Sequence, residues 1–198
     1  MDKSLHRFSP RAFGSMQGLM CQFGRGDGPV AIMICCAGIG DAPEHLSQAR
    51  PGDLFVLQNR GNRVPVDSCE GSTVNAIEFA LRKLCIRDIV VCGHLECPVV
   101  LGSLRSSCER ELPTQQRLKN GERTRALIEK HYADLSSELQ ANIVVQENVL
   151  VQLENLMAHP HIRQRIQQRD IRLHGWLLDD RTRRVWHYDP EFGQFDDY

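Results

Sequence analysis

The sequence has almost no excess of charge of either sign and no long hydrophobic run. Its 198 residues include 24 Lys and Arg against 25 Asp and Glu, so the formal net charge is −1. Because the basic residues are scattered rather than massed, we expect neither a nucleic acid nor an anionic membrane surface as the main partner. The longest apolar run, residues 30–37, is far too short to cross a bilayer.

The N-terminus lacks the apolar segment of a secretory signal. The cysteines lack the regular spacing of a small secreted disulfide framework, and several lie inside strand-like apolar runs. We therefore expect a cytoplasmic protein in which most cysteines are buried free thiols and some bind a metal. The eight cysteines are Cys21, Cys35, Cys36, Cys69, Cys85, Cys92, Cys97 and Cys108.

The composition is that of an ordinary globular domain. Hydrophobic residues make up 41% of the chain and charged residues 25%, and a chain of this length can bury a good-sized core. Residues 1–28 are polar and only weakly periodic. We predict an N-terminal arm over 1–28, followed by a single α/β domain over 29–198 that carries the candidate metal ligands described below.

Short apolar runs bounded by turn residues predict the strands of this domain. Their alternation with helical segments indicates an α/β fold, in which helices flank both faces of a mainly parallel central sheet. The expected strands cover residues 29–36, 53–57, 88–92, 172–178 and 185–188.

Apolar residues at helical spacing predict the helices. The polar segment 109–121 contains Pro113 and is the expected flexible connection. The expected helices cover residues 41–48, 72–84, 122–138 and 141–159.

Three potential metal ligands stand at the ends of predicted strands. Cys36 ends the first strand, while His94 and Cys97 follow a later one. The carboxyl ends of parallel strands line one crevice, so these side chains can converge. Two thiolates and an imidazole suit zinc, with the fourth tetrahedral position open or filled by another group. The H-x-x-C spacing alone is also compatible with simple packing.

Six stretches of the chain resemble, in order, the successive blocks of the β-class carbonic anhydrases. They are ICCAGIGDAPE, PGDLFVLQNRGN, STVNAIEFALRKL, IVVCGHLECPVV, ENVLVQLENLMAHPHIRQRI and IRLHGWLLDDRTRRVWHYDP. The resemblance implies that Cys36, His94 and Cys97 bind one zinc ion per chain. It also implies a homodimer or a dimer-based larger oligomer that acts on CO2 and bicarbonate.

The chain departs from this family at the block C-x-D-x-R, which reads here Cys36-Ala37-Gly38-Ile39-Gly40. In the family, the Asp accepts a hydrogen bond from zinc-bound hydroxide and the Arg fixes that carboxylate. Gly38 and Gly40 replace both residues. Orientation and charge stabilisation of a nucleophile are worth orders of magnitude in rate, so we expect reduced or altered activity.

Asp41 and Arg50 are the candidate catalytic substitutes. Glycines on either side of position 39 allow backbone bends that would bring Asp41 near the ligands, but the residue is also placed to cap a helix. Arg50, like Arg60, could hold bicarbonate as a fixed cation or simply face solvent.

Three functions are compatible with these residues. The nominal function is the reversible hydration of CO2 to bicarbonate by zinc-bound hydroxide, a lyase reaction. The second is a catalytically inactive zinc-binding scaffold or subunit. The third is a zinc hydrolase of a related small molecule such as carbonyl sulfide, because two glycines would enlarge the pocket.

Overall fold

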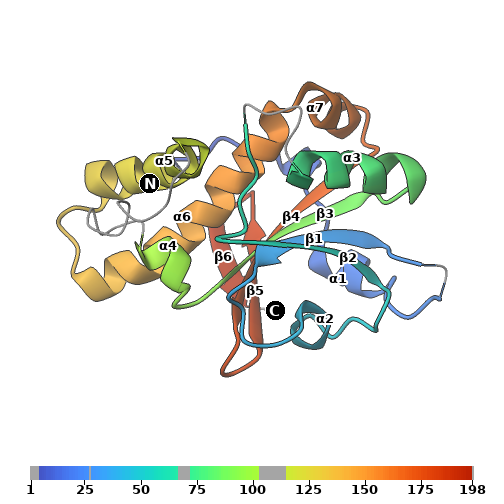
Figure 1. Ribbon diagram of the computed structural model, residues 1–198, viewed down its shortest axis with the longest axis horizontal. Coiled ribbons are helices and arrows are strands. Elements are labelled where there is room, and N and C mark those ends of the chain that lie inside the picture. Colours follow the sequence, from blue (N-terminus) through green and yellow to red (C-terminus); the bar gives the residue numbers. More distant parts are fainter. Residues whose placement is uncertain (1–4, 27, 67–71, 103–114, 198) are drawn as a thin grey trace.

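The computed structural model describes residues 5–26, 28–66, 72–102 and 115–197. Within these residues a six-stranded sheet has the order β2-β1-β3-β4-β5-β6, with helices on both faces (Figure 1). The first four strands of this order are parallel, and the last two join antiparallel. The predicted α/β architecture is therefore confirmed. The strands are β1 (Ala31–Cys36), β2 (Leu54–Asn59), β3 (Asp88–His94), β4 (Arg172–Asp179), β5 (Arg184–Asp189) and β6 (Gln194–Asp197).

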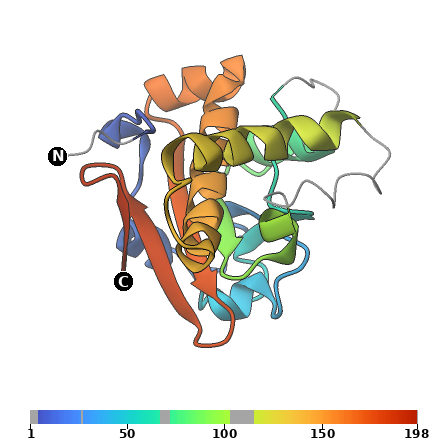
Figure 2. The same ribbon diagram turned by 90° about the vertical axis from the view of Figure 1, so that its left-hand side faces the viewer.

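The helices form two layers around the sheet. Helices α3 and α6 cover one face, α1 and α2 lie on the other (Figure 1), and α5 packs on the outer side of α6 (Figure 2). No helix in the described ranges is long and apolar enough to span a membrane. The helices are α1 (Met16–Met20), α2 (Pro43–Leu46), α3 (Ser72–Lys83), α4 (Pro98–Gly102), α5 (Gln115–His131), α6 (Ser137–Ala158) and α7 (Pro160–Gln167), with a 3-10 helix at Pro10–Ala12.

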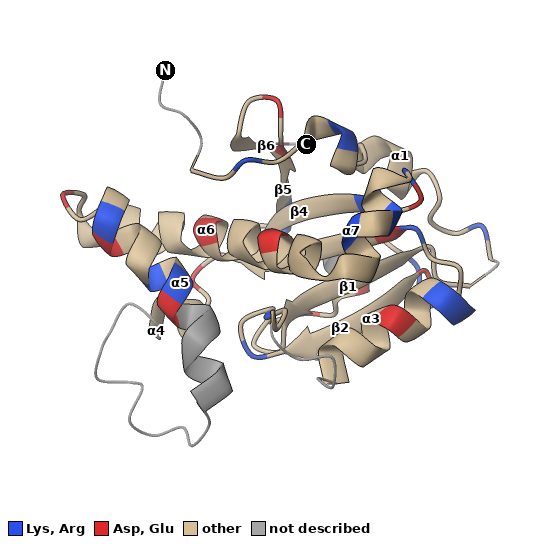
Figure 3. Cartoon of the chain, turned by 90° about the horizontal axis from the view of Figure 1, so that it is seen from above, with Lys and Arg blue, Asp and Glu red and all other residues tan. Residues whose placement is uncertain are grey.

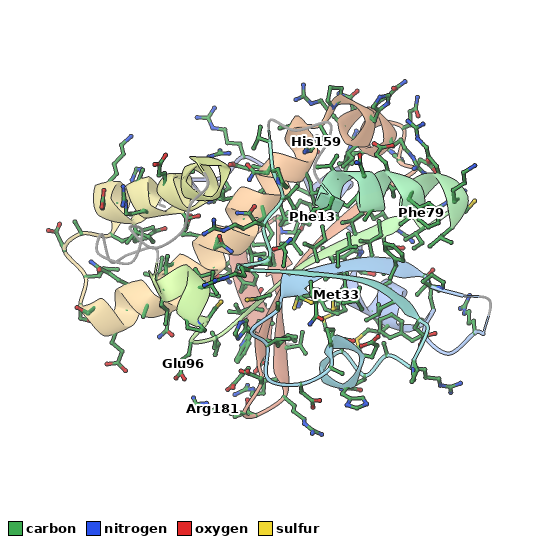
Figure 4. The ribbon with its side chains drawn as sticks, viewed as in Figure 1. Phe13, Met33, Phe79, Glu96, His159 and Arg181 are labelled. Carbon is green, nitrogen blue, oxygen red and sulfur yellow. The ribbon has the colours of Figure 1, made fainter. Side chains whose placement is uncertain are left out.

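The central strand β1 is buried on both faces, which explains its unbroken apolar sequence. Ile32 and Ile34 join a core cluster formed with α3 and α6. Met33, labelled at the centre of Figure 4, and Cys35 join a second cluster with α1 on the opposite face. Charged residues of both signs are scattered over the helices seen from above (Figure 3).

The N-terminal segment packs onto this domain. Met16 and Leu19 of α1 are buried in the second cluster. His6 binds two carboxylates of α6, with its Nε2 at 2.7 Å from Glu147 and its Nδ1 at 3.0 Å from Glu154. Burial alone would lower the pKa of His6, but the two carboxylates outweigh it and raise the pKa to about 9.

Several predicted element boundaries are wrong. Helix α5 begins at Gln115 and ends at His131, so residues 115–121 of the expected flexible connection are helical, and its residues 109–114 lie outside the described ranges. The segment is polar, but Gln, Arg, Leu and Lys are all good helix formers. Ser136 starts the next helix by accepting a hydrogen bond from the Leu139 N–H. Helix α7 and strand β6 were not predicted.

Among the described residues, most cysteines are buried free thiols, as predicted. All six that the structure describes are free thiols. Four of them are buried, but Cys21 and Cys85 are exposed, because each stands at or just beyond the end of a helix. Cys69 and Cys108 lie outside the described ranges.

Candidate metal centre

The three proposed ligands meet at the carboxyl edge of the sheet. β1 pairs with β3 in parallel, with Cys35 opposite Cys92. Cys36, the last residue of β1, therefore lies beside the end of β3, where His94 is the last residue. Cys97 follows immediately and α4 starts at Pro98, where proline fits a first helical position. One donor atom from each of Cys36, His94 and Cys97 lies within 4.8 Å of the other two, and all three residues are buried.

The two thiols are hydrogen-bonded to each other. The Cys97 Sγ donates to the Cys36 Sγ at 3.6 Å, and the backbone N–H groups of Gly38 and Gly61 donate to the same sulfur at 3.3 Å each. The bond from Cys97, then the nearby imidazole of His94 and these N–H groups, lower the pKa of Cys36, while the same sulfur–sulfur contact raises the pKa of Cys97. The site thus stabilises one thiolate, and a cation bound between the sulfurs would stabilise the second.

His94 is the residue that most clearly lacks a partner. Its exposed fraction is only 3%, yet neither ring nitrogen has a hydrogen-bond partner. Buried polar atoms are almost always paired, since an unpaired one costs about 1–3 kcal/mol. A metal ion would satisfy one of the nitrogens. An imidazole beside two thiols is a donor set that fits zinc.

The space beside Gly40 is more crowded than the sequence predicts. A side chain at Gly38 would begin in ordinary contact with the Cys36 Sγ, at 3.6 Å. At Gly40, however, an added Cβ would lie only 3.1 Å from the Oδ2 of Asp180. That oxygen accepts the Gly40 N–H at 3.2 Å and lies 3.8 Å from the Nδ1 of His94. Sequence reasoning missed Asp180, which lies just beyond the expected strand 172–178.

Asp41 is not part of the converging group. Its carboxylate accepts the Ala42 N–H at 2.7 Å and lies 3.3 Å from the His45 Nδ1 and 3.4 Å from the Arg183 Nη2. The Ala42 N–H and then His45 lower its pKa. The prediction that Asp41 caps the helix is wrong, because Ala42 is the N-cap of α2 and makes no side-chain cap.

The other candidate residues point elsewhere. Arg50 is exposed and donates through Nη1 to the Gly24 carbonyl at 3.2 Å, so it fixes the N-terminal segment. Arg60 is exposed. Cys35 and Cys92 face the opposite side of the sheet from Cys36. Burial raises the pKa of Cys35 to about 12 and that of Cys92 well above its ordinary value, so both remain thiols.

A row of amides on α6 holds the loop that contacts Cys36, and no sequence pattern predicted it. Gly61 has a φ of 80°, which favours glycine, and its carbonyl accepts from Asn148 at 3.2 Å. Gln152 and Asn155 bind the N–H and the carbonyl of Val64 at 2.8 and 3.0 Å. His159, labelled in Figure 4, contacts the Pro65 carbonyl at 2.7 Å. The Gly61 N–H is therefore held rigidly at the thiol.

Comparison with known proteins places these residues in a wider group. A sequence model described as carbonic anhydrase matches residues 31–185. The carbonic anhydrase of Synechocystis sp. is 36% identical over 98% of this chain and 72% of its own length. That of Pseudomonas aeruginosa is 34% identical over 90% of this chain and 82% of its own length. The solved structure of the β-carbonic anhydrase CcaA superposes with a TM-score of 0.80 at 34% identity, over 92% of this chain and 90% of that one.

Proposed function

Because the chain belongs to the β-class carbonic anhydrase family, we propose that it catalyses the reversible hydration of CO2 to bicarbonate at one zinc ion held by Cys36, His94 and Cys97. The observation that carries this proposal is the convergence of three buried donors, one of which is a histidine whose ring nitrogens have no hydrogen-bond partner. Bound zinc would supply the acidity that turns a water molecule into a nucleophile at neutral pH.

The chain's own residues prepare the site for a cation. The N–H groups of Gly38 and Gly61 stabilise negative charge on Cys36 before any metal arrives. The amide row of α6 fixes the loop that carries Gly61, so this donor does not have to reorganise. Two thiolates would neutralise the ion, which makes its water less acidic than at a site with three imidazoles.

The proposed enzyme is slower than a family member with the complete C-x-D-x-R block. Gly38 and Gly40 offer no side chain that could orient the nucleophile, and Asp41 is bound to His45 and Arg183 instead. Loss of one preorganised polar group typically costs about 10²–10³ in rate. We therefore propose measurable but reduced CO2 hydration.

The test is stopped-flow CO2 hydration on protein whose zinc content per chain has been measured. The wild type should exceed the buffer rate, and Cys97→Ser should not. Gly38→Asp, whose added side chain has room beside Cys36, should turn over faster per bound zinc than the wild type. A wild type that carries one zinc per chain but gives only the buffer rate would contradict the enzyme and favour the zinc-binding scaffold.

We further propose a homodimer or a dimer-based larger oligomer in the cytoplasm. The β-carbonic anhydrases of Sordaria macrospora, which share this fold with a TM-score of 0.68 at 23% identity, are described as tetrameric. Free thiols at all six described cysteines fit a reducing compartment. Light scattering should give a mass of at least twice the chain's 22.5 kDa; a monomer at micromolar concentration would contradict the oligomer.

A further inference from the structure

We propose that Asp180 is a positioning residue of the metal centre, whose carboxylate accepts the Nδ1–H of His94 and so presents Nε2 to the metal between the two thiols. The inference rests on the proposed zinc site and adds a residue that the C-x-D-x-R block does not contain. It assigns a role to the carboxylate that lies over Gly40.

The sheet register delivers Asp180 to this position. β3 and β4 are parallel, with His94 opposite Leu178, and the Leu95 N–H donates to the Leu178 carbonyl at 2.8 Å. Asp180 comes two residues later, in the turn to β5. Asp179 stiffens that turn by accepting the Arg181 N–H at 3.0 Å and the Thr182 hydroxyl at 2.8 Å. The turn is therefore fixed beside the end of β3.

The glycine loop completes the placement. The Gly40 N–H donates to the same oxygen, Oδ2, that approaches His94. A side chain at position 40 would crowd this oxygen, whereas one at Gly38 would not. The absence of a side chain at position 40 thus makes room for the carboxylate.

The chemistry of a metal-bound histidine requires such an acceptor. When one ring nitrogen binds the metal, the other carries a proton and usually donates it to a carboxylate, a carbonyl or water, which fixes the ring. The Nδ1 of His94 has no such partner, and Asp180 Oδ2 lies 3.8 Å away. That separation is about 1 Å longer than a charge-assisted hydrogen bond. Asp180 is not in the group whose donors all lie within 4.8 Å, which favours a role behind the ligand over ligation.

Zinc affinity, measured by competition with a chromophoric chelator, tests the inference. Asp180→Ala should weaken zinc binding about 10–100-fold, the usual cost of losing such a partner. Asp180→Asn, which keeps an acceptor oxygen without the charge, should fall between that variant and the wild type. Glu96→Ala is the matched control. Its side chain is 70% exposed and pairs with Arg181 at 3.6 Å, at the lower edge of Figure 4, so it should leave the affinity unchanged.

Two glycines give a second pair of variants. Gly40→Ala should weaken zinc binding several-fold by displacing the carboxylate, whereas Gly102→Ala, where an added Cβ meets no atom within 4 Å, should not. Neither glycine has a positive φ, so alanine fits the backbone of both. Gly40→Ala should have no further effect in the Asp180→Ala background, because both changes would act through the same contact. If the two losses of zinc affinity add in the double variant, the proposed action of Gly40 through Asp180 is overturned.

A spectroscopic readout separates positioning from general stability. In zinc-loaded wild type, the Nδ1 proton of His94 should be visible by ¹⁵N-edited NMR and should exchange slowly with water; in Asp180→Ala it should exchange rapidly. Equal zinc affinity and equal exchange in the two proteins would overturn the role of Asp180 while leaving the proposed function intact. A wild type that binds no zinc would instead overturn the proposed function.

Discussion

Strands β3 and β4 carry a buried or partly buried histidine–carboxylate pair at each end, and the two pairs differ in one respect. At the amino end, the Nε2 of His174 lies 2.8 Å from Asp88 Oδ1, and Arg172 donates to Asp88 Oδ2 at 2.6 Å. At the carboxyl end, Asp180 stands 3.8 Å from His94, and both His94 ring nitrogens lack hydrogen bonds. The first pair is complete as folded and the second is not.

The difference separates a structural polar cluster from a binding site. Although burial alone would raise the pKa of Asp88, His174 and Arg172 lower it below its ordinary value. Asp88 therefore stabilises the fold at every pH above its unfolded pKa of about 4, and this contribution is lost as the pH falls through its lower folded pKa. The unpaired atoms of His94 have the opposite effect, since they cost stability until a ligand binds.

The largest expected effect comes from removing a metal ligand at the carboxyl end of the strands, where the histidine lacks a partner. Cys97→Ser should reduce zinc from one ion per chain to almost none, because only one thiolate and one imidazole would remain. Elemental analysis of purified protein measures this. Cys85→Ser, at an exposed thiol outside the site, should keep its zinc. Full zinc in Cys97→Ser would show that the metal binds elsewhere.

A change at the amino end, where the histidine–carboxylate pair is complete, should lower stability and leave zinc binding intact. Asp88→Asn removes the charge that pairs with His174 and Arg172, and loss of one partner from a buried ion pair costs about 3–5 kcal/mol. Urea unfolding of the metal-free protein measures this loss, while the zinc affinity of the folded variant should equal that of the wild type. A weakened zinc affinity in Asp88→Asn would mean that the two ends of β3 and β4 are coupled.

A third histidine, His6, sharpens the comparison through pH. Its pKa of about 9 is raised above the unfolded value, so its stabilisation is complete below about pH 6.5 and is lost as the pH rises through 9. The shift corresponds to about 3 kcal/mol in the free energy of unfolding. In urea titrations, the free energy of unfolding of His6→Gln should not show this fall between pH 6 and 9. An identical pH dependence in both proteins would contradict the ion pairs with Glu147 and Glu154.

Sequence patterns were sufficient where the information is local. The unbroken apolar run of β1 predicted a doubly buried strand, and the placement of Cys36, His94 and Cys97 after strands predicted their convergence. Asp180 and Gly61 could not be found in this way. Asp180 is placed by the register of β4 against β3, and Gly61 is placed by a side chain of α6. In both cases the partner lies more than 80 residues away in the chain.

The local patterns also misjudged polarity. The start of α5 is helical although it is mostly polar. The amides of α6 at positions 148, 152 and 155 are buried although their residue types favour the surface. They are buried because the loop from Gly61 to Pro65 offers its backbone groups as partners. Such pairing is a property of the tertiary structure.

X-ray absorption at the zinc edge tests the metal centre most directly. Wild-type protein with one zinc per chain should show two sulfur ligands at about 2.3 Å and nitrogen or oxygen ligands at about 2.0–2.1 Å. Cys97→Ser loaded with excess zinc should lose one sulfur. A zinc shell of nitrogen and oxygen alone in the wild type, or no stoichiometric zinc, would contradict a centre formed by Cys36, His94 and Cys97.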